Sequence, residues 1–335
     1  MDFCTPSKRW ILFSPAGGDR DKSYNVIVMI YSYARVRALG LGNLLFPWAR
    51  AVVATDKYGL TPIWPTWFQP RVGPFLRREK DKRLYFDLFS RPSYYVGGIR
   101  KLRLLRAAER ISEATINDDP AALATTGERN RIVEFSGMGG YFQSILTDHE
   151  LVRRELINMT RPHHKRSLAF DFSGSVSVHV RMGEFTVPSD ASVLKTGAEN
   201  LRHPMSWYAE QVTRIRRACG RDITAYVFSD GTDEELAELL ALPNTRRMSF
   251  GSSLGDLLAL SRAEVLIASG STFSMWASYI GRMPVIWHTG QIRQRLYYDR
   301  PDLEIQSDGD EDDPTNALDL VAERICNGMP MAAGL

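Results

Sequence analysis

Short apolar runs alternate with amphipathic segments along most of this chain. Apolar, β-branched runs predict buried strands at residues 25–33, 61–65, 131–137, 175–180, 222–230, 264–270 and 283–288. Apolar positions spaced three to four apart predict helices at residues 45–59, 206–220, 232–242, 254–263, 272–281 and 314–328. A further strand-like run covers residues 9–14. Strands that alternate with helices predict a doubly wound α/β fold with parallel sheets.

Several of these helices carry end signals. Gly220 is placed to end the helix at 206–220 with a left-handed residue. Thr232 and Glu235 have the spacing of a capping box. Pro47 is predicted near the first turn of the helix at 45–59, where proline is tolerated.

The chain has 335 residues, which is long for one core and suits two domains. Strand–helix alternation occurs in both halves, and the segment TRPHHKRS at 160–167 lies between them. We therefore predict one domain over residues 1–165 and a second over 166–335, facing each other across a cleft. Ligands of such folds bind beyond the carboxyl ends of the strands.

Composition excludes several classes. Hydrophobic residues make up 44% and charged residues 24%, as in ordinary soluble proteins. A formal charge of +3 is too small to indicate nucleic-acid binding. There is no apolar run long enough for a membrane span, no signal-peptide pattern and no paired cysteines, so a cytoplasmic protein is expected. The basic segment 100–110 favours a solvated amphipathic helix, with peripheral contact to an anionic inner membrane face as the alternative.

Polar side chains gather where the predicted strands end. In the second half they are His179, Arg181, Ser229, Asp230, Ser269, Ser271, Thr272 and Ser274, and in the first half Gly40, Gly42, Asn43 and the segment 140–144. An arginine fork matches two phosphoryl oxygens, and the free N–H groups at a helix start attract anions. Each feature alone is common on protein surfaces, but their recurrence at several strand ends predicts a phosphate site.

Four stretches resemble the α1,2-fucosyltransferases and, more distantly, the α1,6- and protein O-fucosyltransferases. They are GLGNLLFPWARA (40–51), GYFQS (140–144), HVRMGEF (179–185), and VFSD (227–230) followed by DLLALSRAEVLIASGSTFSMWAS (256–278). Their order matches that of the family. The resemblance implies a GT-B-like fold of two Rossmann-type domains, GDP-L-fucose as the donor, and an oligosaccharide or lipid-linked glycan as the acceptor.

The resemblance also implies residue roles. Arg181 would hold the donor diphosphate, and Asp256 would accept the N1–H and N2–H₂ donors of guanine. The expected donor-binding set is Gly42, Asn43, His179, Arg181, Ser229, Asp230, Asp256, Ser271, Thr272, Phe273 and Ser274, with His179 nearer the nucleoside. The chain departs from the family's His-x-Arg-Arg-x-Asp motif at Met182 and Glu184. The simpler alternatives are a core role for His179 and helix capping for Asn43, Ser271 and Asp256.

The chemistry expected at this site is inverting transfer with no metal and no other cofactor. Arg181 and Glu184 are the expected catalytic residues; Glu184 either acts as the base or only orients Arg181. Asp19 and Asp190 are weaker candidates for the base, and a water relay is the other option.

Other functions fit less well. The glycines at 40 and 42 lack the third glycine of a dinucleotide fingerprint, which argues against an oxidoreductase. Asp308 and Asp310 have Asp-x-Asp spacing but lie in an acidic loop. His163 and His164 are adjacent, so they are expected to face different ways and not to form a metal site. A transferase using another nucleotide sugar, or a non-catalytic nucleotide or glycan binder, stays open as an alternative.

Overall fold

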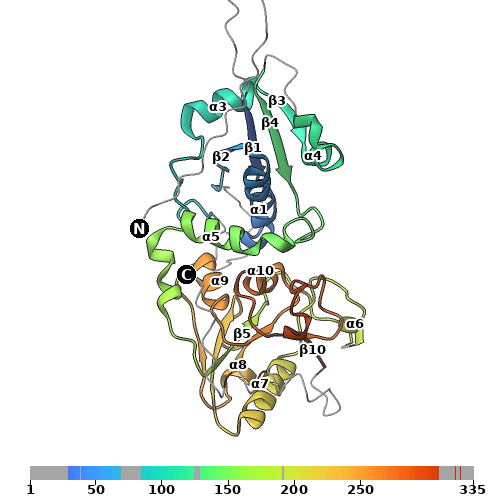
Figure 1. Cartoon of the computed structure of the whole chain (residues 1–335). Coiled ribbons are helices and arrows are strands. Elements are labelled where there is room, and N and C mark those ends of the chain that lie inside the picture. Colours follow the sequence, from blue (N-terminus) through green and yellow to red (C-terminus); the bar gives the residue numbers. More distant parts are fainter. Residues whose placement is uncertain are drawn as a thin grey trace, which may run out of the picture.

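The computed structural model describes residues 29–37, 39–68, 84–123, 129–190, 192–308, 321 and 325, and it shows two lobes that each contain a parallel sheet (Figure 1). The first lobe contains β1 (Ile30–Arg35), α1 (Leu41–Tyr58), β2 (Thr61–Ile63), α3 (Gly98–Ala107), β3 (Glu109–Ser112), α4 (Glu113–Asp118), β4 (Arg131–Ser136) and α5 (His149–Met159). The second contains β5 (Ser175–Val180), α6 (Ser192–Lys195), α7 (Met205–Cys219), β6 (Thr224–Ser229), α8 (Ala237–Leu240), β7 (Thr245–Arg247), α9 (Ser253–Leu260), β8 (Leu266–Ala268), α10 (Thr272–Gly281), β9 (Val285–His288) and β10 (Glu304–Ser307). Short 3-10 turns occur at Pro120–Leu123, Leu146–Asp148, Pro162–His164, Arg166–Ala169 and Pro301–Leu303.

The first sheet has the order β2-β1-β4-β3, and every pairing is parallel. Alternation along β1 divides its side chains between two cores. Ala34 packs with α1 on one face, while Tyr31 and Tyr33 pack with Leu104 of α3 on the other. Helices therefore cover both faces of the sheet.

The second sheet has the order β10-β9-β8-β5-β6-β7, again with parallel pairing throughout. All six residues of β5 are buried, as its apolar run predicts for a central strand. Counted from β5, this is the strand order 3-2-1-4-5-6 of a Rossmann fold. The expected fold class, two Rossmann-type α/β domains in a GT-B-like pair, is confirmed.

Helix ends test the sequence predictions most directly. Helix α7 ends at Cys219, and Gly220 follows in the left-handed region with φ 64, as predicted. Thr232 and Glu235 form both capping-box hydrogen bonds, at 3.2 and 2.9 Å. The helix that follows the capping box, α8, spans only Ala237–Leu240 and is shorter than the predicted 232–242.

Two expectations about α1 are wrong. The helix begins at Leu41, four residues earlier than predicted, so Pro47 lies inside it and not in its first turn. The residue before the helix is Gly40, so Asn43 is not its N-cap. Proline at position 47 cannot donate the backbone hydrogen bond that a helix normally sends four residues back, to the carbonyl of Asn43.

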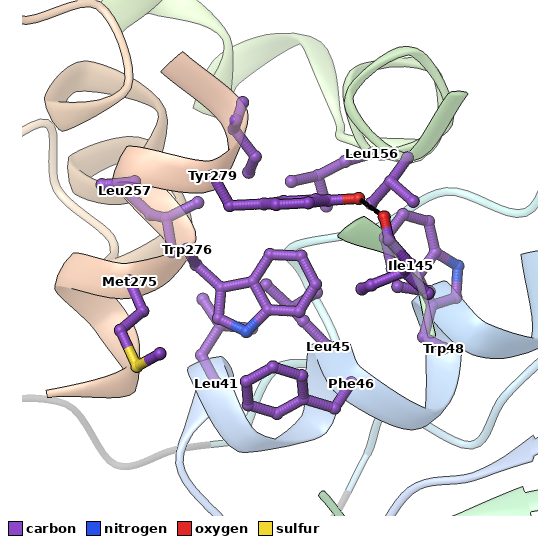
Figure 2. Close-up of a cluster of buried hydrophobic side chains, with 14 of the residues drawn as sticks. Leu41, Leu45, Phe46, Trp48, Ile145, Leu156, Leu257, Met275, Trp276 and Tyr279 are labelled. Atoms are coloured by element: carbon purple, nitrogen blue, oxygen red, sulfur yellow. Dashed lines mark hydrogen bonds between the residues drawn. The ribbon is translucent and has the colours of Figure 1, made fainter. Parts of the chain in front are cut away.

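The two lobes meet through an apolar core that is continuous between them. Helix α10 packs against α1 and α5. Figure 2 shows Trp276 and Tyr279 of α10 inserted among Phe46, Ile145 and neighbouring side chains. The Tyr279 hydroxyl donates to the carbonyl of Ile145 at 2.5 Å, which ties α10 to the end of the 140–145 loop.

The predicted domain boundary near residue 165 stays a prediction. Strands β1–β4 lie before it and β5–β10 after it. The predicted strand at 9–14 lies outside the described residues, as does most of the predicted helix at 314–328, of which Val321 and Ile325 are described as buried. Among the helices that the structure describes, none has the length and apolarity needed to cross a membrane.

Candidate active site

The site is built where the second sheet reverses its strand order. The chain leaves β5 toward β6 on one side, while the neighbour of β5 on the other side, β8, leads to β9. Such a switch point leaves a crevice beyond the carboxyl ends of the two central strands. Arg181 follows β5 at this edge, and the segment 269–271 follows β8.

Beneath this edge, His179 lies in a cluster of serines. Its Nδ1 lies 2.7 Å from the Ser274 hydroxyl and 3.0 Å from the Ser269 hydroxyl. Ser269 also contacts the Ser271 hydroxyl at 3.0 Å. Burial, reinforced by the charge of Arg181, lowers the pKa of His179 to about 3, so the imidazole is neutral at physiological pH.

His179, Ser271 and Ser274 of the predicted donor-binding set have partners within this cluster. Ser274 is wholly buried, and Ser271 is the N-cap of α10, accepting from the Ser274 N–H at 3.3 Å. Their roles toward a donor stay predictions. With Nδ1 occupied, His179 retains only Nε2 for another contact. His179, Ser271 and Ser274 therefore form a hydrogen-bonded layer beneath the carboxyl ends of β5 and β8.

The start of α10 meets the start of α1. A Cβ on Gly42 would lie 2.9 Å from the Thr272 hydroxyl and 3.3 Å from the Phe273 nitrogen, so only glycine allows this approach. Thr272 donates to the Asn43 side-chain oxygen at 2.8 Å, across 229 residues of sequence. The N-termini of an 18-residue and a 10-residue helix thus converge, and both carry partial positive charge.

Phe273 supports the same corner. Its ring stacks on His179 with centroids 4.9 Å apart and stays partly exposed. Together, Gly42, Asn43, Thr272 and Phe273 form the part of the predicted set that the structure brings into direct contact across the two lobes.

Arg181 follows β5, and its guanidinium is held by two carboxylates. It pairs with Asp230 and, at 3.4 Å, with Glu184, and its side chain is 21% exposed. Asp230 also accepts from the Met182 N–H at 2.8 Å, so it holds the turn after β5 as well as the Arg181 guanidinium. Ser229 accepts from the Gly231 N–H at 3.0 Å and shapes the adjacent turn. Glu184 thus lies where it can orient Arg181.

Asp256 lies at the start of α9, on the same edge of the sheet. Its two oxygens accept from the Phe250 N–H at 2.5 Å and the Ser249 hydroxyl at 3.1 Å. The N-cap of α9 is Ser252, so Asp256 does not cap this helix. It braces the loop before the helix.

Sequence reasoning missed Arg293. This guanidinium donates to the Gly270 carbonyl at 2.8 Å and pairs with Glu199 at 3.5 Å, with its side chain 11% exposed. It places a second cation beside the β8 exit. Arg293 follows β9, which is next to β8 in the sheet, and an arginine after a predicted strand was the sequence feature that could have placed it at this site.

The other carboxylates considered earlier have local partners. Asp190 accepts from the Ser192 N–H at 2.7 Å at the start of α6, and Asp308 pairs with Lys195 at 2.6 Å. Asp19 and Asp310 lie outside the described residues.

The first lobe has a hollow of its own, of about 650 Å³, at the carboxyl ends of β1, β3 and β4. Its wall includes Tyr33 and Ser112, and Glu134 stands between Arg35 and Arg110, which both pair with its carboxylate. Arg110, the last residue of the basic segment 100–110, lies in β3 and lines this hollow.

No protein-family model and no curated protein sequence matches the chain significantly. Among solved structures, it is similar to the fucosyltransferase NodZ from Bradyrhizobium, with 14% identity, coverage of 78% of this chain and 94% of that chain, and a TM-score of 0.47. It is also similar to NodZ α1,6-fucosyltransferase crystallised with GDP, at 15% identity, 78% and 95% coverage and a TM-score of 0.48. POFUT1 in complex with GDP-fucose gives 11% identity, 77% and 98% coverage and a TM-score of 0.49.

Proposed function

We propose that this chain is an inverting, metal-independent glycosyltransferase that transfers L-fucose from GDP-fucose to a hydroxyl of a glycan acceptor. The sugar and the nucleotide follow from the four sequence stretches that resemble fucosyltransferases. The observation that carries the proposal is the convergence of the N-termini of α1 and α10 at the switch point of a Rossmann sheet, where Arg181 follows the neighbouring strand β5.

The chemistry follows from the charge that develops. The acceptor oxygen attacks the anomeric carbon, the bond from that carbon to the diphosphate oxygen breaks, and GDP leaves with the bonding electrons. Donors that are already in place stabilise this leaving group best. Arg181 is held in place by Asp230, and the N–H groups at the starts of α1 and α10 supply further donors.

The proton of the acceptor hydroxyl needs a separate path. Glu184 is 51% exposed and lies beside Arg181, so it can accept this proton directly or through water. The acceptor, an oligosaccharide or a lipid-linked glycan, would approach from the first lobe.

The first experiment is a thermal-shift panel of GDP, UDP, ADP and CMP with the purified chain. A rise in melting temperature that is specific to GDP supports GDP-fucose as the donor. A preference for another nucleotide would indicate a sugar donor that carries that nucleotide. Slow hydrolysis of GDP-fucose then separates an enzyme from a non-catalytic binder, since a binder shows the shift without release of fucose.

We expect donor turnover to proceed in excess EDTA. Arg181 and the two helix starts provide positive charge at the leaving group, which is the role that a divalent ion plays in metal-dependent transferases. The measurement is the rate of GDP release with EDTA and with added Mn²⁺ or Mg²⁺. Complete loss in EDTA with recovery on adding either ion would contradict the prediction.

We expect Asp256→Ala to abolish the preference for GDP over ADP and UDP. One carboxylate can accept two parallel donors from guanine, and a buried donor without an acceptor binds poorly. The bonds of Asp256 to Phe250 and Ser249 predict a stability loss of about 1 kcal/mol as well. If calorimetry finds an unchanged preference for GDP in the folded variant, Asp256 only stabilises the loop before α9 and does not recognise guanine.

A further inference from the structure

Three side chains converge on one point of the linker between the two lobes. His163 and His164 lie in the 3-10 turn Pro162–His164 after α5, and Asp87 comes from a loop of the first lobe. The sequence predicted that the two adjacent imidazoles face different ways, and this is wrong. Their rings lie with centroids 4.0 Å apart, and both Nε2 atoms approach Asp87.

The spacing of the ligand atoms fits a metal ion. The Asp87 Oδ2 atom lies 3.0 Å from the His163 Nε2 and 3.7 Å from the His164 Nε2. Ligand bonds of about 2.0–2.1 Å at tetrahedral angles place neighbouring ligand atoms about 3.3 Å apart. The two measured distances lie on either side of that value, and all three ligand atoms lie within 4.8 Å of one another.

Two of the three ligands, His164 and Asp87, also have a second contact that orients them. The His164 Nδ1 lies 2.8 Å from the hydroxyl of Ser252, the N-cap of α9. The His164 Nε2 lies 3.2 Å from the backbone carbonyl oxygen of Asp87. A proton on Nδ1 would leave the lone pair of Nε2 for a metal ion, as outer-shell contacts do for metal-bound histidines. Arg161 binds the other oxygen of Asp87, Oδ1, at 2.8 Å, and so leaves Oδ2 for the ion.

The cluster is open to solvent. His163 and Asp87 are 44% and 48% exposed, which leaves solvent access for a water as the fourth ligand.

We propose that Asp87, His163 and His164 form a binding site for a divalent transition metal of the Zn²⁺ class, placed on the linker and separate from the donor site. Two imidazoles and one carboxylate suit Zn²⁺, Co²⁺ or Ni²⁺ better than Mg²⁺ or Ca²⁺. The ion would fasten the Asp87 loop of the first lobe to the linker, and through Ser252 to α9 of the second. Its role is to stabilise the junction, so turnover in EDTA is still expected.

The test is metal binding by the full chain, purified without a histidine tag and stripped with EDTA. We expect calorimetry to show one Zn²⁺ per chain, Co²⁺ to give the visible absorption of a site with imidazole ligands, and Zn²⁺ to raise the melting temperature. His163→Ala and Asp87→Asn, both at exposed positions, should each weaken binding at least about tenfold and remove the thermal shift.

His149→Ala is the matched control, because His149 stands 3.4 Å from one carboxylate, that of Glu150, and is outside the proposed site. It should bind Zn²⁺ as the wild type does. GDP binding should be unchanged in His163→Ala, which separates this proposal from that of the donor site. Absence of one-to-one binding by the wild type, or equal affinity in wild type, His163→Ala and Asp87→Asn, would overturn the site.

Discussion

Arg181→Ala should lower the rate of transfer several hundredfold while the protein stays folded. A preorganised donor to developing negative charge contributes about 3–4 kcal/mol to the transition state, and each 1.4 kcal/mol is about tenfold in rate. Asp230 and Glu184, which lose their partner, are 31% and 51% exposed, so water can solvate both and the cost in stability is small. The measurement is kcat for GDP-fucose together with the melting temperature.

Two variants sharpen this test. Arg181→Lys should recover little activity, because an ammonium group cannot present two parallel donors to a diphosphate. Arg282→Ala removes a similarly paired guanidinium, bound to Asp299, at the opposite end of α10. It should reduce stability and leave kcat unchanged. A lower melting temperature for Arg181→Ala with full specific activity of the folded fraction would make Arg181 a structural residue.

Strands of the second lobe could be predicted where hydrophobicity is continuous, and not where it is absent. β5 is a run of six buried residues, and its pattern alone places it at the centre of a sheet. β7 consists of Thr245–Arg247, with no buried residue, and lies at the sheet edge. Its backbone is held extended by pairing with β6, so its own sequence carries no pattern that predicts a strand. β10, at the other edge of this sheet, and β3, at the edge of the first sheet, are four residues each with a single apolar residue, and both were missed.

The candidate site shows a similar division. Its location at the ends of β5 and β8 follows from the alternation of strands and helices. Asn43 and Thr272, both in the predicted donor-binding set, are joined by a hydrogen bond, and their roles toward a donor stay predictions. The inward turn of the Ser271 and Ser274 hydroxyls could not be predicted, because a sequence pattern gives the face of a helix and not the partner of a hydroxyl. Arg293 was missed because it lies in a loop, where no periodicity applies.

The apolar junction between the lobes affects how the site works. Linked domains usually move unless their interface is large and hydrophobic. Here the side chains of α1, α5, α9 and α10 form one buried cluster (Figure 2), and the starts of α1 and α10 meet in this junction. Because Gly42 belongs to this junction, the approach of the two helix starts is set by packing.

Trp276→Ala should therefore lower both the stability of the protein and its affinity for the donor. Trp276 is fully buried, its ring lies 5.1 Å from that of Phe46 and 4.7 Å from that of Phe142, and its indole N–H donates to the Gly42 carbonyl at 2.6 Å. Removing a buried tryptophan side chain costs about 3–5 kcal/mol of unfolding free energy. The Gly42 carbonyl also loses its donor, which loosens the contact between the starts of α1 and α10.

The measurement is urea unfolding followed by GDP calorimetry on the folded variant. Trp207→Ala is the matched control, because Trp207 is equally an indole in a core, belongs to the separate cluster under α7, and donates to the Ser307 carbonyl at 2.9 Å. We expect both variants to lose stability and only Trp276→Ala to lose GDP affinity. Equal GDP affinities in the two variants would show that the donor site does not depend on the packing of Trp276 against Gly42, and a stability loss below about 1 kcal/mol would show that the junction can repack around the cavity.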